Sequence, residues 1–323
     1  MDKSVVVIGG GTGISSVLRG LKTKTEHISA IVTMADDGGH SGSLRRDRGI
    51  LPPGDVRNCL IALANTEPAM EELLQYRYGG GPLEGQNLGN LLIAALNDLT
   101  GDFEEALRQL SKVLKVTGEV LPVTVENVNL MGSFDDGTRV FGESAIARYG
   151  KRHGREIRKV AMVPSGARAS HWAVEAIERG DAIVIGPGSL YTSLIPNLLF
   201  PEVLEAIMNS KAPVLYIANM MSQGGETQGM GLSQHIAALE RHGLRGRIHS
   251  VLWNSSPIPE ALLKRYLMEE NAFPIPLKDG DLTFLKQRGI QLVEGDYLED
   301  SGQFIRHSGE KLALEIENIL SEN

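Results

Sequence analysis

The stretch Val5-Val6-Val7-Ile8-Gly9-Gly10-Gly11-Thr12-Gly13-Ile14-Ser15 decides the fold of this chain. Its four β-branched residues, Val5 to Ile8, predict a buried parallel strand. Four glycines among positions 9–13 then turn the chain, and a helix is expected over 14–22. A strand–turn–helix unit of this kind directs free backbone N–H groups and a helix N-terminus at one point, which favours phosphate binding. A tight turn without a ligand is the alternative.

The turn departs from the common phosphate-binding fingerprints. Counted from Gly9, the G-x-G-x-x-G dinucleotide pattern places Ile14 where a third glycine belongs. No Gly-Lys-Ser/Thr of a P-loop follows either. The turn therefore predicts an anion site at the start of an α/β pattern but does not name the ligand.

Length and composition limit the classes of protein. A chain of 323 residues forms one large α/β domain or two smaller ones. The formal net charge of -8 argues against a nucleic-acid surface. The single cysteine, Cys59, excludes an intramolecular disulfide, and its place on an apolar helical stripe predicts a buried, inert thiol. With no signal segment and no apolar run of about 20 residues, we expect a cytoplasmic protein without a membrane span.

The β-strands predicted along the chain end in polar or glycine-rich loops. Five of these ends stand at Gly9, Asp36, Gly186, Asn219 and Asn254. In a mostly parallel sheet such ends lie along one edge, where ligands bind. The convergence of five loops predicts a site more strongly than any single loop does.

The second of these loops carries acidic residues beside glycines. It runs Ala35-Asp36-Asp37-Gly38-Gly39-His40-Ser41-Gly42-Ser43-Leu44-Arg45-Arg46. Asp36 and Asp37 stand where nucleotide-binding βαβ folds meet ribose hydroxyls. Gly38 and Ser41, with the arginine pair, suit a second anionic group. The alternative is a flexible polar loop.

A helical segment follows. Asp55 is predicted to be the N-cap of a helix over 56–65, with Arg57 and Asn58 in its first turn. Arg57 opposes the helix dipole there, so we expect it to meet a phosphate or an aspartate, unless it is an ordinary surface arginine. Further helices are expected at 68–77, 88–99 and 102–114. Asn87 and Asn90 begin the helix over 88–99 as caps or as cleft residues, and a leucine-rich stripe predicts that this helix packs into the core.

From residue 116 onward the sequence pattern changes from helical spacing to short runs of strand-forming residues. Short runs at 119–123, 125–130, 138–141 and 158–163, with a hairpin signal at 135–138, predict an antiparallel insert or sheet extension. The basic run 151–155 is expected to be a solvated loop. Next comes a third glycine turn, Gly186-Pro187-Gly188-Ser189-Leu190-Tyr191-Thr192-Ser193, with Ser189 as the expected N-cap of a helix. An irregular segment to Phe304 and a last helix over 311–320 close the chain.

No catalytic constellation is recognised. The histidines show no H-E-x-x-H or H-x-H spacing, so we assign neither a catalytic nor a metal-ligating residue. Asp36, Asp37, Asp55 and Glu226 suit acid–base work, or the binding of Mg²⁺ together with a phosphate. Carboxylates are also common as helix caps and ribose ligands.

Six motifs in order together resemble the bacterial YvcK-type gluconeogenesis factor family, which is related to the CofD-type 2-phospho-L-lactate transferases. They are Gly9 to Gly13, Ala35 to Gly42, Pro52 to Asn58, Leu88 to Leu92, Gly186 to Ser193 and Gly225 to Thr227. The resemblance implies a Rossmann-like α/β fold, with a mostly parallel sheet and helices on both faces. It implies one CofD-like domain, 1–323, containing a helical segment (55–115), a β-rich insert (116–163) and a C-terminal cap segment (255–323). His40 is a departure, because relatives often carry serine there.

The resemblance also implies a nucleotide-sugar ligand, UDP-N-acetylglucosamine, rather than a demonstrated reaction. Family members are needed for growth and normal cell shape on gluconeogenic carbon sources and are linked to the supply of cell-wall precursors. The family's uridine-sugar contacts match Tyr266 and Arg306 in this sequence. Without the resemblance, Tyr266 is a packing residue at helical spacing from Ile258 and Leu262, and Arg306 is a surface charge.

Three functional hypotheses remain open. The first is a nucleotide-sugar-binding regulator, with glucosamine-6-phosphate synthase as the partner that the resemblance suggests. The second is an Mg²⁺-dependent transferase of the phospho-lactate type, and the third is an NAD enzyme. A homodimer is expected only from the general frequency of twofold assemblies. The candidate ligand-binding residues are Gly10, Gly11, Thr12, Gly13, Asp36, Asp37, Gly38, Ser41, Asp55, Arg57, Asn58, Asn87, Asn90, Gly186, Gly188, Ser189, Thr192, Asn219, Asn254, Tyr266 and Arg306.

Overall fold

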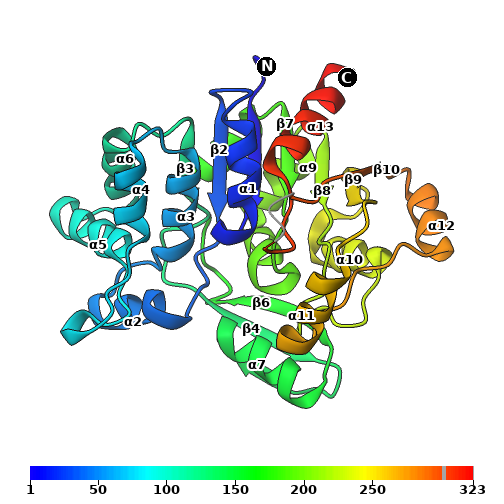
Figure 1. Ribbon diagram of the computed structural model, residues 1–323, viewed down its shortest axis with the longest axis horizontal. Coiled ribbons are helices and arrows are strands. Elements are labelled where there is room, and N and C mark those ends of the chain that lie inside the picture. The colour runs from blue at the N-terminus through cyan, green and yellow to red at the C-terminus, as the bar shows by residue number, and fades with distance from the viewer. Residues whose placement is uncertain (300–302, 323) are drawn as a thin grey trace.

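The chain folds around one seven-stranded parallel sheet (Figure 1). The computed structural model describes residues 1–299 and 303–322; residues 300–302 and 323, which fall in the predicted cap segment, lie outside the described part. The strand order is β10-β9-β8-β7-β1-β2-β3. The strands are β1 (Val5–Gly9), β2 (Ile28–Val32), β3 (Glu119–Pro122), β7 (Ala182–Ile185), β8 (Val214–Ile217), β9 (Ile248–Asn254) and β10 (Gln291–Gly295).

Strand β1 lies at the centre of the sheet, as its apolar sequence predicts. It pairs in parallel with β2 on one side and with β7 on the other, and Val5 to Ile8 are fully buried. The strand order therefore reverses at β1, and the loops after β1 and β7 diverge there. In open α/β sheets such a switch point forms a crevice at the carboxyl ends of the strands.

Helices cover the sheet and form an arm beside it. Helix α1 packs against α3 and α13, whereas α8 packs against α9 (Figure 1). The arm, drawn in blue to cyan, holds α2 and α4 to α6. The helices are α1 (Gly11–Leu21), α2 (Gly39–Arg48), α3 (Gly54–Leu63), α4 (Pro68–Gln75), α5 (Leu88–Thr100), α6 (Phe103–Val113), α7 (Glu143–His153), α8 (His171–Arg179), α9 (Pro201–Asn209), α10 (Leu232–Leu239), α11 (Glu260–Glu270), α12 (Asp279–Arg288) and α13 (Gly309–Glu322).

A small antiparallel sheet confirms the predicted β insert. Its order is β5-β4-β6, with β4 (Asn129–Phe134) paired to β5 (Arg139–Phe141) and β6 (Ile157–Val163). Helix α7 contacts β4 and β5 and includes Lys151, Arg152 and His153 of the basic run 151–155, which was expected to form a loop. The α/β fold class predicted from the sequence is therefore confirmed.

Two predictions about strands were wrong in part. The run 119–123 was expected to belong to an antiparallel insert or a sheet extension; β3 does extend the main sheet at its edge, but it pairs in parallel with β2. The segment before Phe304 was expected to be irregular, yet it contains α12 and the edge strand β10. Edge strands bury little on their outer side, so β10, which has no fully buried residue, lacks a strong apolar signal.

Two predictions about helices were also wrong, the second only in part. The loop after β2 contains α2, a helix with few apolar residues that ends at the left-handed Gly49. Buried Arg45 fastens α2 by donating to the side chain of Asn127 and the carbonyl of Val128. Helix α5 does pack into the core, but through Ile93; of the predicted stripe, Leu96 packs partly against the core while Leu92 and Leu99 are exposed. In both cases contacts with distant parts of the chain, and not the local sequence pattern, determine the structure: they stabilise α2 and select the face of α5 that is buried.

Candidate functional site

The crevice at the switch point contains two adjoining cavities. Thr12, Gly13, Gly188 and Gln223 line both of them, so together they form one cleft. The smaller cavity, about 360 Å³, is also lined by Asp36, Asp55 and Glu143, and we call it the carboxylate chamber. The larger, about 970 Å³, is also lined by Arg19, Lys24 and Arg306, and we call it the arginine chamber. The cleft thus places acidic and basic groups at opposite ends of the glycine turns.

The first glycine turn is capped from a neighbouring helix. Helix α1 begins at Gly11, and the N-cap residue Gly10 supplies no side-chain hydrogen bond. The Asp55 carboxylate instead lies beside the backbone N–H groups of Gly11 and Thr12, which lower its pKa and so stabilise its charged form. Asp55 lies in the first turn of α3, which starts at Gly54, so its prediction as the N-cap of its own helix was wrong. A carboxylate of the protein therefore already lies at the positive end of α1.

Burial raises the pKa values of the acids in the carboxylate chamber. Burial and the nearby Asp36 raise the pKa of Asp55 to about 6. Burial raises the pKa of Asp36 as well, although its carboxylate accepts a hydrogen bond from the Gly38 N–H at 2.8 Å. Burial, followed by repulsion from Asp36 and Glu226, raises the pKa of Glu143 to about 7. At neutral pH this chamber therefore holds groups that are close to exchanging a proton.

The antiparallel insert supplies Glu143. The Asp37 carboxylate accepts a hydrogen bond from the Ser144 N–H at 2.9 Å and so fastens the start of α7 to the loop after β2. Asp37 faces this contact and does not line either chamber, whereas Glu143 lines the carboxylate chamber. Local sequence gave no signal for Glu143, because only the packing of α7 brings it to the cleft.

A polar network supports the outer side of the first turn. Asn87 caps α5 by accepting from the Asn90 N–H at 3.0 Å. Arg57 donates to the side-chain oxygens of Asn90 at 2.7 Å and Asn58 at 2.8 Å, and Asn58 in turn donates to the Thr12 hydroxyl at 3.0 Å. Arg57 therefore has partners within the protein, as its unfavourable place at a helix N-terminus predicted, although these partners are amides.

The third glycine turn is held by the loop after β8. Asn219 accepts from the Gly188 N–H at 3.1 Å and donates to the Gly188 carbonyl at 2.7 Å. The Gln223 amide donates to the Ser189 hydroxyl at 2.6 Å, while its own carbonyl oxygen meets no hydrogen-bond donor within the described part of the chain. The expected helix after Ser189 is replaced by two short helical turns, Leu190–Leu194 and Ile195–Leu199, and Ser189 makes no capping bond.

The arginine chamber is closed by the segment before α13. The Arg306 guanidinium lies 4.7 Å from the centre of the Phe304 ring. The next residue, His307, is buried and contacts the Ala218 carbonyl through Nε2 at 3.1 Å, and burial lowers its pKa to about 4. Tyr266 accepts a hydrogen bond from the Ile305 N–H at 3.2 Å. Tyr266 therefore supports the backbone beside Arg306 and does not itself line the chamber.

Ten of the predicted site residues line the cleft. These are Gly10, Thr12, Gly13, Asp36, Asp55, Gly188, Ser189, Thr192, Asn219 and Arg306. The others do not line either chamber: Gly11, Asp37, Gly38, Ser41, Arg57, Asn58, Asn87, Asn90, Gly186, Asn254 and Tyr266. Asn254 is an example, because it accepts from the Tyr297 N–H and donates to the Ser256 carbonyl. Whether any of them binds a ligand stays a prediction.

The carboxylates of the cleft suit a metal ion that needs only one or two protein ligands. Among residues 1–299 and 303–322, no group of three or more His, Cys, Asp or Glu side chains is placed to hold a metal ion. Mg²⁺, however, commonly uses one or two carboxylates and completes its shell with substrate phosphates and water. Asp36 and Asp55, which line the same chamber, fit that role.

The fold and cleft define a class: a Rossmann-like α/β protein with a polar ligand site at its topological switch point. The chain belongs to the CofD family, described as 2-phospho-L-lactate transferase CofD, whose sequence profile matches residues 5–298. It is 44% identical over 312 residues to the gluconeogenesis factor of Halalkalibacterium halodurans, covering 96% of this chain and 94% of that one. It is 42% identical over 319 residues to the gluconeogenesis factor of Bacillus subtilis, covering 98% of each.

A solved structure has the same architecture. A crystal structure of a UPF0052 family protein from Bacillus halodurans superposes with a TM-score of 0.92 at 43% sequence identity. The match covers 98% of this chain and 99% of that chain. The predicted resemblance to the gluconeogenesis factors and to CofD is therefore confirmed. In the described part of the chain, every helix is too short or too polar to cross a membrane.

Proposed function

We propose that the cleft binds a nucleotide sugar, UDP-N-acetylglucosamine, and that the protein acts as a regulator. The observation that carries the proposal is the continuity of the two chambers past Thr12, Gly13, Gly188 and Gln223. A nucleotide sugar is long and has a doubly charged centre, so it needs basic groups beside groups that bind hydroxyls. Arg306, Arg19 and Lys24 supply the basic groups in the arginine chamber.

The chemistry of the carboxylate chamber supports a sugar or ribose there. Carboxylates with raised pKa values either accept hydrogen bonds from hydroxyls or, when protonated, donate to them. Asp55 and Glu143 have this property, with pKa values of about 6 and 7. A diphosphate is better placed at the arginine chamber, because Asp55 already occupies the N-terminus of α1.

A regulator acts through a difference in affinity between two states. Ligand binding joins the segment before α13 to the glycine turns, because Arg306 and Gly188 line the same chamber. We propose that this link changes the surface offered to a partner in the cytoplasm, with glucosamine-6-phosphate synthase as the partner and a homodimer as the working assembly. The role in growth and cell shape under gluconeogenic conditions, through the supply of cell-wall precursors, belongs to the same proposal.

One observation favours a second candidate, an Mg²⁺-dependent transferase. The CofD profile covers nearly the whole chain, and Asp36 and Asp55 line one chamber as a carboxylate pair. In that function the two aspartates would hold Mg²⁺ together with a phosphate, and Arg306 would bind the far end of the substrate. An NAD enzyme has less support, because the dinucleotide fingerprint is broken at Ile14.

One panel of ligands separates these functions. Calorimetry and thermal melting are measured with UDP-N-acetylglucosamine, NAD and a deazaflavin, each with and without Mg²⁺. At about 100 times its dissociation constant, a ligand of the native state stabilises it by roughly 2.7 kcal/mol. A response to the nucleotide sugar without turnover supports the regulator. No response to it overturns that function, and turnover of a phosphorylated substrate with Mg²⁺ favours the transferase.

A further inference from the structure

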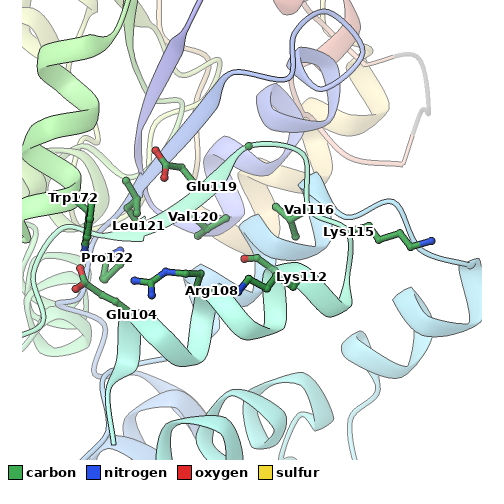
Figure 2. A pocket seen from close by; sticks show the side chains of 12 residues that line it. Glu104, Arg108, Lys112, Lys115, Val116, Glu119, Val120, Leu121, Pro122 and Trp172 are labelled. Atoms are coloured by element: carbon green, nitrogen blue, oxygen red, sulfur yellow. The ribbon is translucent and has the colours of Figure 1, made fainter. Parts of the chain in front are cut away.

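A second cavity lies away from the cleft, at the edge of the main sheet. It measures about 520 Å³ and lies between β3 and α6, with Trp172 of α8 at one end (Figure 2). Val116, Val120, Leu121 and Pro122 form its apolar lining. We call this cavity the edge groove. Its volume is within the range of cavities that bind ligands in other proteins.

The backbone of β3 directs unpaired groups toward the edge groove. The Val123 N–H donates to the Val32 carbonyl, so the backbone groups of residue 123 point toward β2. Because hydrogen-bonding direction alternates along a strand, residues 119 and 121 also face β2, and Val120 and Pro122 face outward. No strand lies beyond β3 in the described part of the sheet. The N–H and C=O of Val120 and the C=O of Pro122 are therefore free to pair with an added strand.

Basic side chains outnumber acidic ones in the lining of the edge groove. The basic ones are Arg108, Lys112 and Lys115, and the acidic ones are Glu104 and Glu119. Glu104 accepts a hydrogen bond from the Ser170 hydroxyl and Glu119 from the Ser29 hydroxyl, which orient the carboxylates but leave their charge in place. Arg108 pairs with Glu105. Exposed Lys112 has no ion-pair partner among the described residues, and its side chain lies on α6 beside that of Arg108, in the lining of the groove (Figure 2). On a protein with a net charge of -8, this is a local site for negative charge.

The geometry points to the edge groove as a docking site for an extended, acidic peptide segment of a partner protein. The segment adds to the sheet beside β3, in the manner of β-strand addition, where main-chain bonds give affinity and side-chain contacts give specificity. One face of the added strand meets α6, so its acidic side chains reach Lys112 and Arg108. Trp172, which is 44% exposed, packs against an apolar residue at the end of the segment. A helix or a compact ligand leaves the free backbone groups of Val120 unpaired.

The test uses a short fluorescent peptide that alternates glutamate and valine, measured by fluorescence anisotropy with the full-length protein. We expect saturable binding, and no binding of the matching peptide that alternates lysine and valine. Methylating the backbone nitrogens along the peptide's β3-facing edge is expected to abolish binding, because it blocks strand pairing without changing charge. Trp172 fluorescence should change with the same dependence on peptide concentration.

Two protein variants test the groove itself. Lys112→Glu is expected to weaken the acidic peptide about fivefold, because an attraction becomes a repulsion. Its matched control is Lys286→Glu on α12, at the opposite edge of the sheet, which makes the same change in net charge (Figure 1). Val120→Pro removes an outward N–H while leaving the bonds to β2 intact and should also cost about fivefold. Thermal melting confirms that the variants fold.

Three results overturn the proposal. The first is equal binding of the acidic and basic peptides, and the second is binding by Lys112→Glu and the wild type alike. The third combines two observations. Glutarate, a small dicarboxylate, binds to the wild type but not to Lys112→Glu, and the methylated and unmethylated peptides bind with equal affinity. That last result identifies a small-anion site in place of a strand-addition site. None of these measurements involves the cleft, so they stand apart from the test of the proposed function.

Discussion

Thr192 and Glu226 are joined by a buried hydrogen bond across the ends of two neighbouring strands. The Thr192 hydroxyl donates to Glu226 Oε1 at 2.8 Å, and the Tyr191 N–H donates to Oε2 at 3.2 Å. Thr192 follows β7 and Glu226 follows β8, so the bond ties together two loops at the switch point. Burial raises the pKa of Glu226, and these donors oppose the rise. The Glu226 carboxylate therefore links the two loops beside the cleft, although its burial disfavours its charged form.

We expect Thr192→Val to lower the free energy of unfolding by about 1–3 kcal/mol, because it leaves a buried carboxylate short of a donor. Without that donor the pKa of folded Glu226 rises further above its unfolded value. Stability is then lost as pH rises through the folded pKa, so the penalty should be larger at pH 8 than at pH 5. Urea unfolding at both pH values measures it. Thr283→Val on the exposed face of α12 is the control, and an equal effect of the two substitutions would contradict this account.

Glu143 should make the folded state less stable as pH rises. Its pKa of about 7 lies above its ordinary value of 4.5, so its contribution is fully present below pH 4.5 and is lost as pH rises through 7. We expect Glu143→Gln to match the wild type near pH 4 and to be more stable by about 1–3 kcal/mol at pH 8. Thermal melting across this range measures the difference. Glu205→Gln on the exposed side of α9 should show no such trend, and a constant offset for Glu143→Gln would assign its effect to packing.

The central fold could be predicted because its signals are local. The run of β-branched residues before Gly9 identifies a buried strand without reference to any partner, and the strands β7 to β9 carry the same signal. For β3 the sequence left an antiparallel insert and a sheet extension open, and its parallel pairing was missed, because the pairing of a short strand depends on distant residues. Strand β10 was missed because an edge strand with exposed Gln291 and Glu294 does not show an apolar run.

The cleft could be predicted only in part for a similar reason. Glycine turns can be recognised from the sequence, because several glycines follow directly after an apolar strand, and Gly13 and Gly188 were predicted in this way. Glu143 reaches the cleft only because α7 packs there, and nothing in its own neighbourhood indicates it. Asp55 was read as a cap of its own helix because capping patterns are local, whereas its carboxylate caps α1 across the interface between the two helices.

Tyr266 is expected to act as a positioning residue for the arginine chamber. Its hydroxyl accepts from the Ile305 N–H, one residue before Arg306. We expect Tyr266→Phe to weaken UDP-N-acetylglucosamine about five- to tenfold in calorimetry, since an unpaired N–H costs about 1 kcal/mol or more and the segment shifts. Arg306→Ala should cost more, because it removes a charge from the chamber. Tyr76→Phe, at a half-exposed tyrosine on the helical arm, is the matched control. Loss of binding in Tyr76→Phe would remove the argument for a local role of Tyr266.

Gly13 keeps the first and third glycine turns in contact. A Cβ added at Gly13 would lie 2.2 Å from the carbonyl oxygen of Pro187 and 2.8 Å from the Cα of Gly188, both of which are backbone atoms that cannot turn aside. We therefore expect Gly13→Ala to separate the turns and lower the free energy of unfolding by about 1–3 kcal/mol, with weaker ligand binding as the chambers move apart. Gly280→Ala is the control, because a Cβ there meets no atom within 4 Å. Gly280 lies within α12, so this change should stabilise by about 0.5–1 kcal/mol. Urea unfolding of both variants and the wild type measures the two changes in the free energy of unfolding, which should have opposite signs. If Gly13→Ala were stabilised instead, the two turns would not be in the close contact described here.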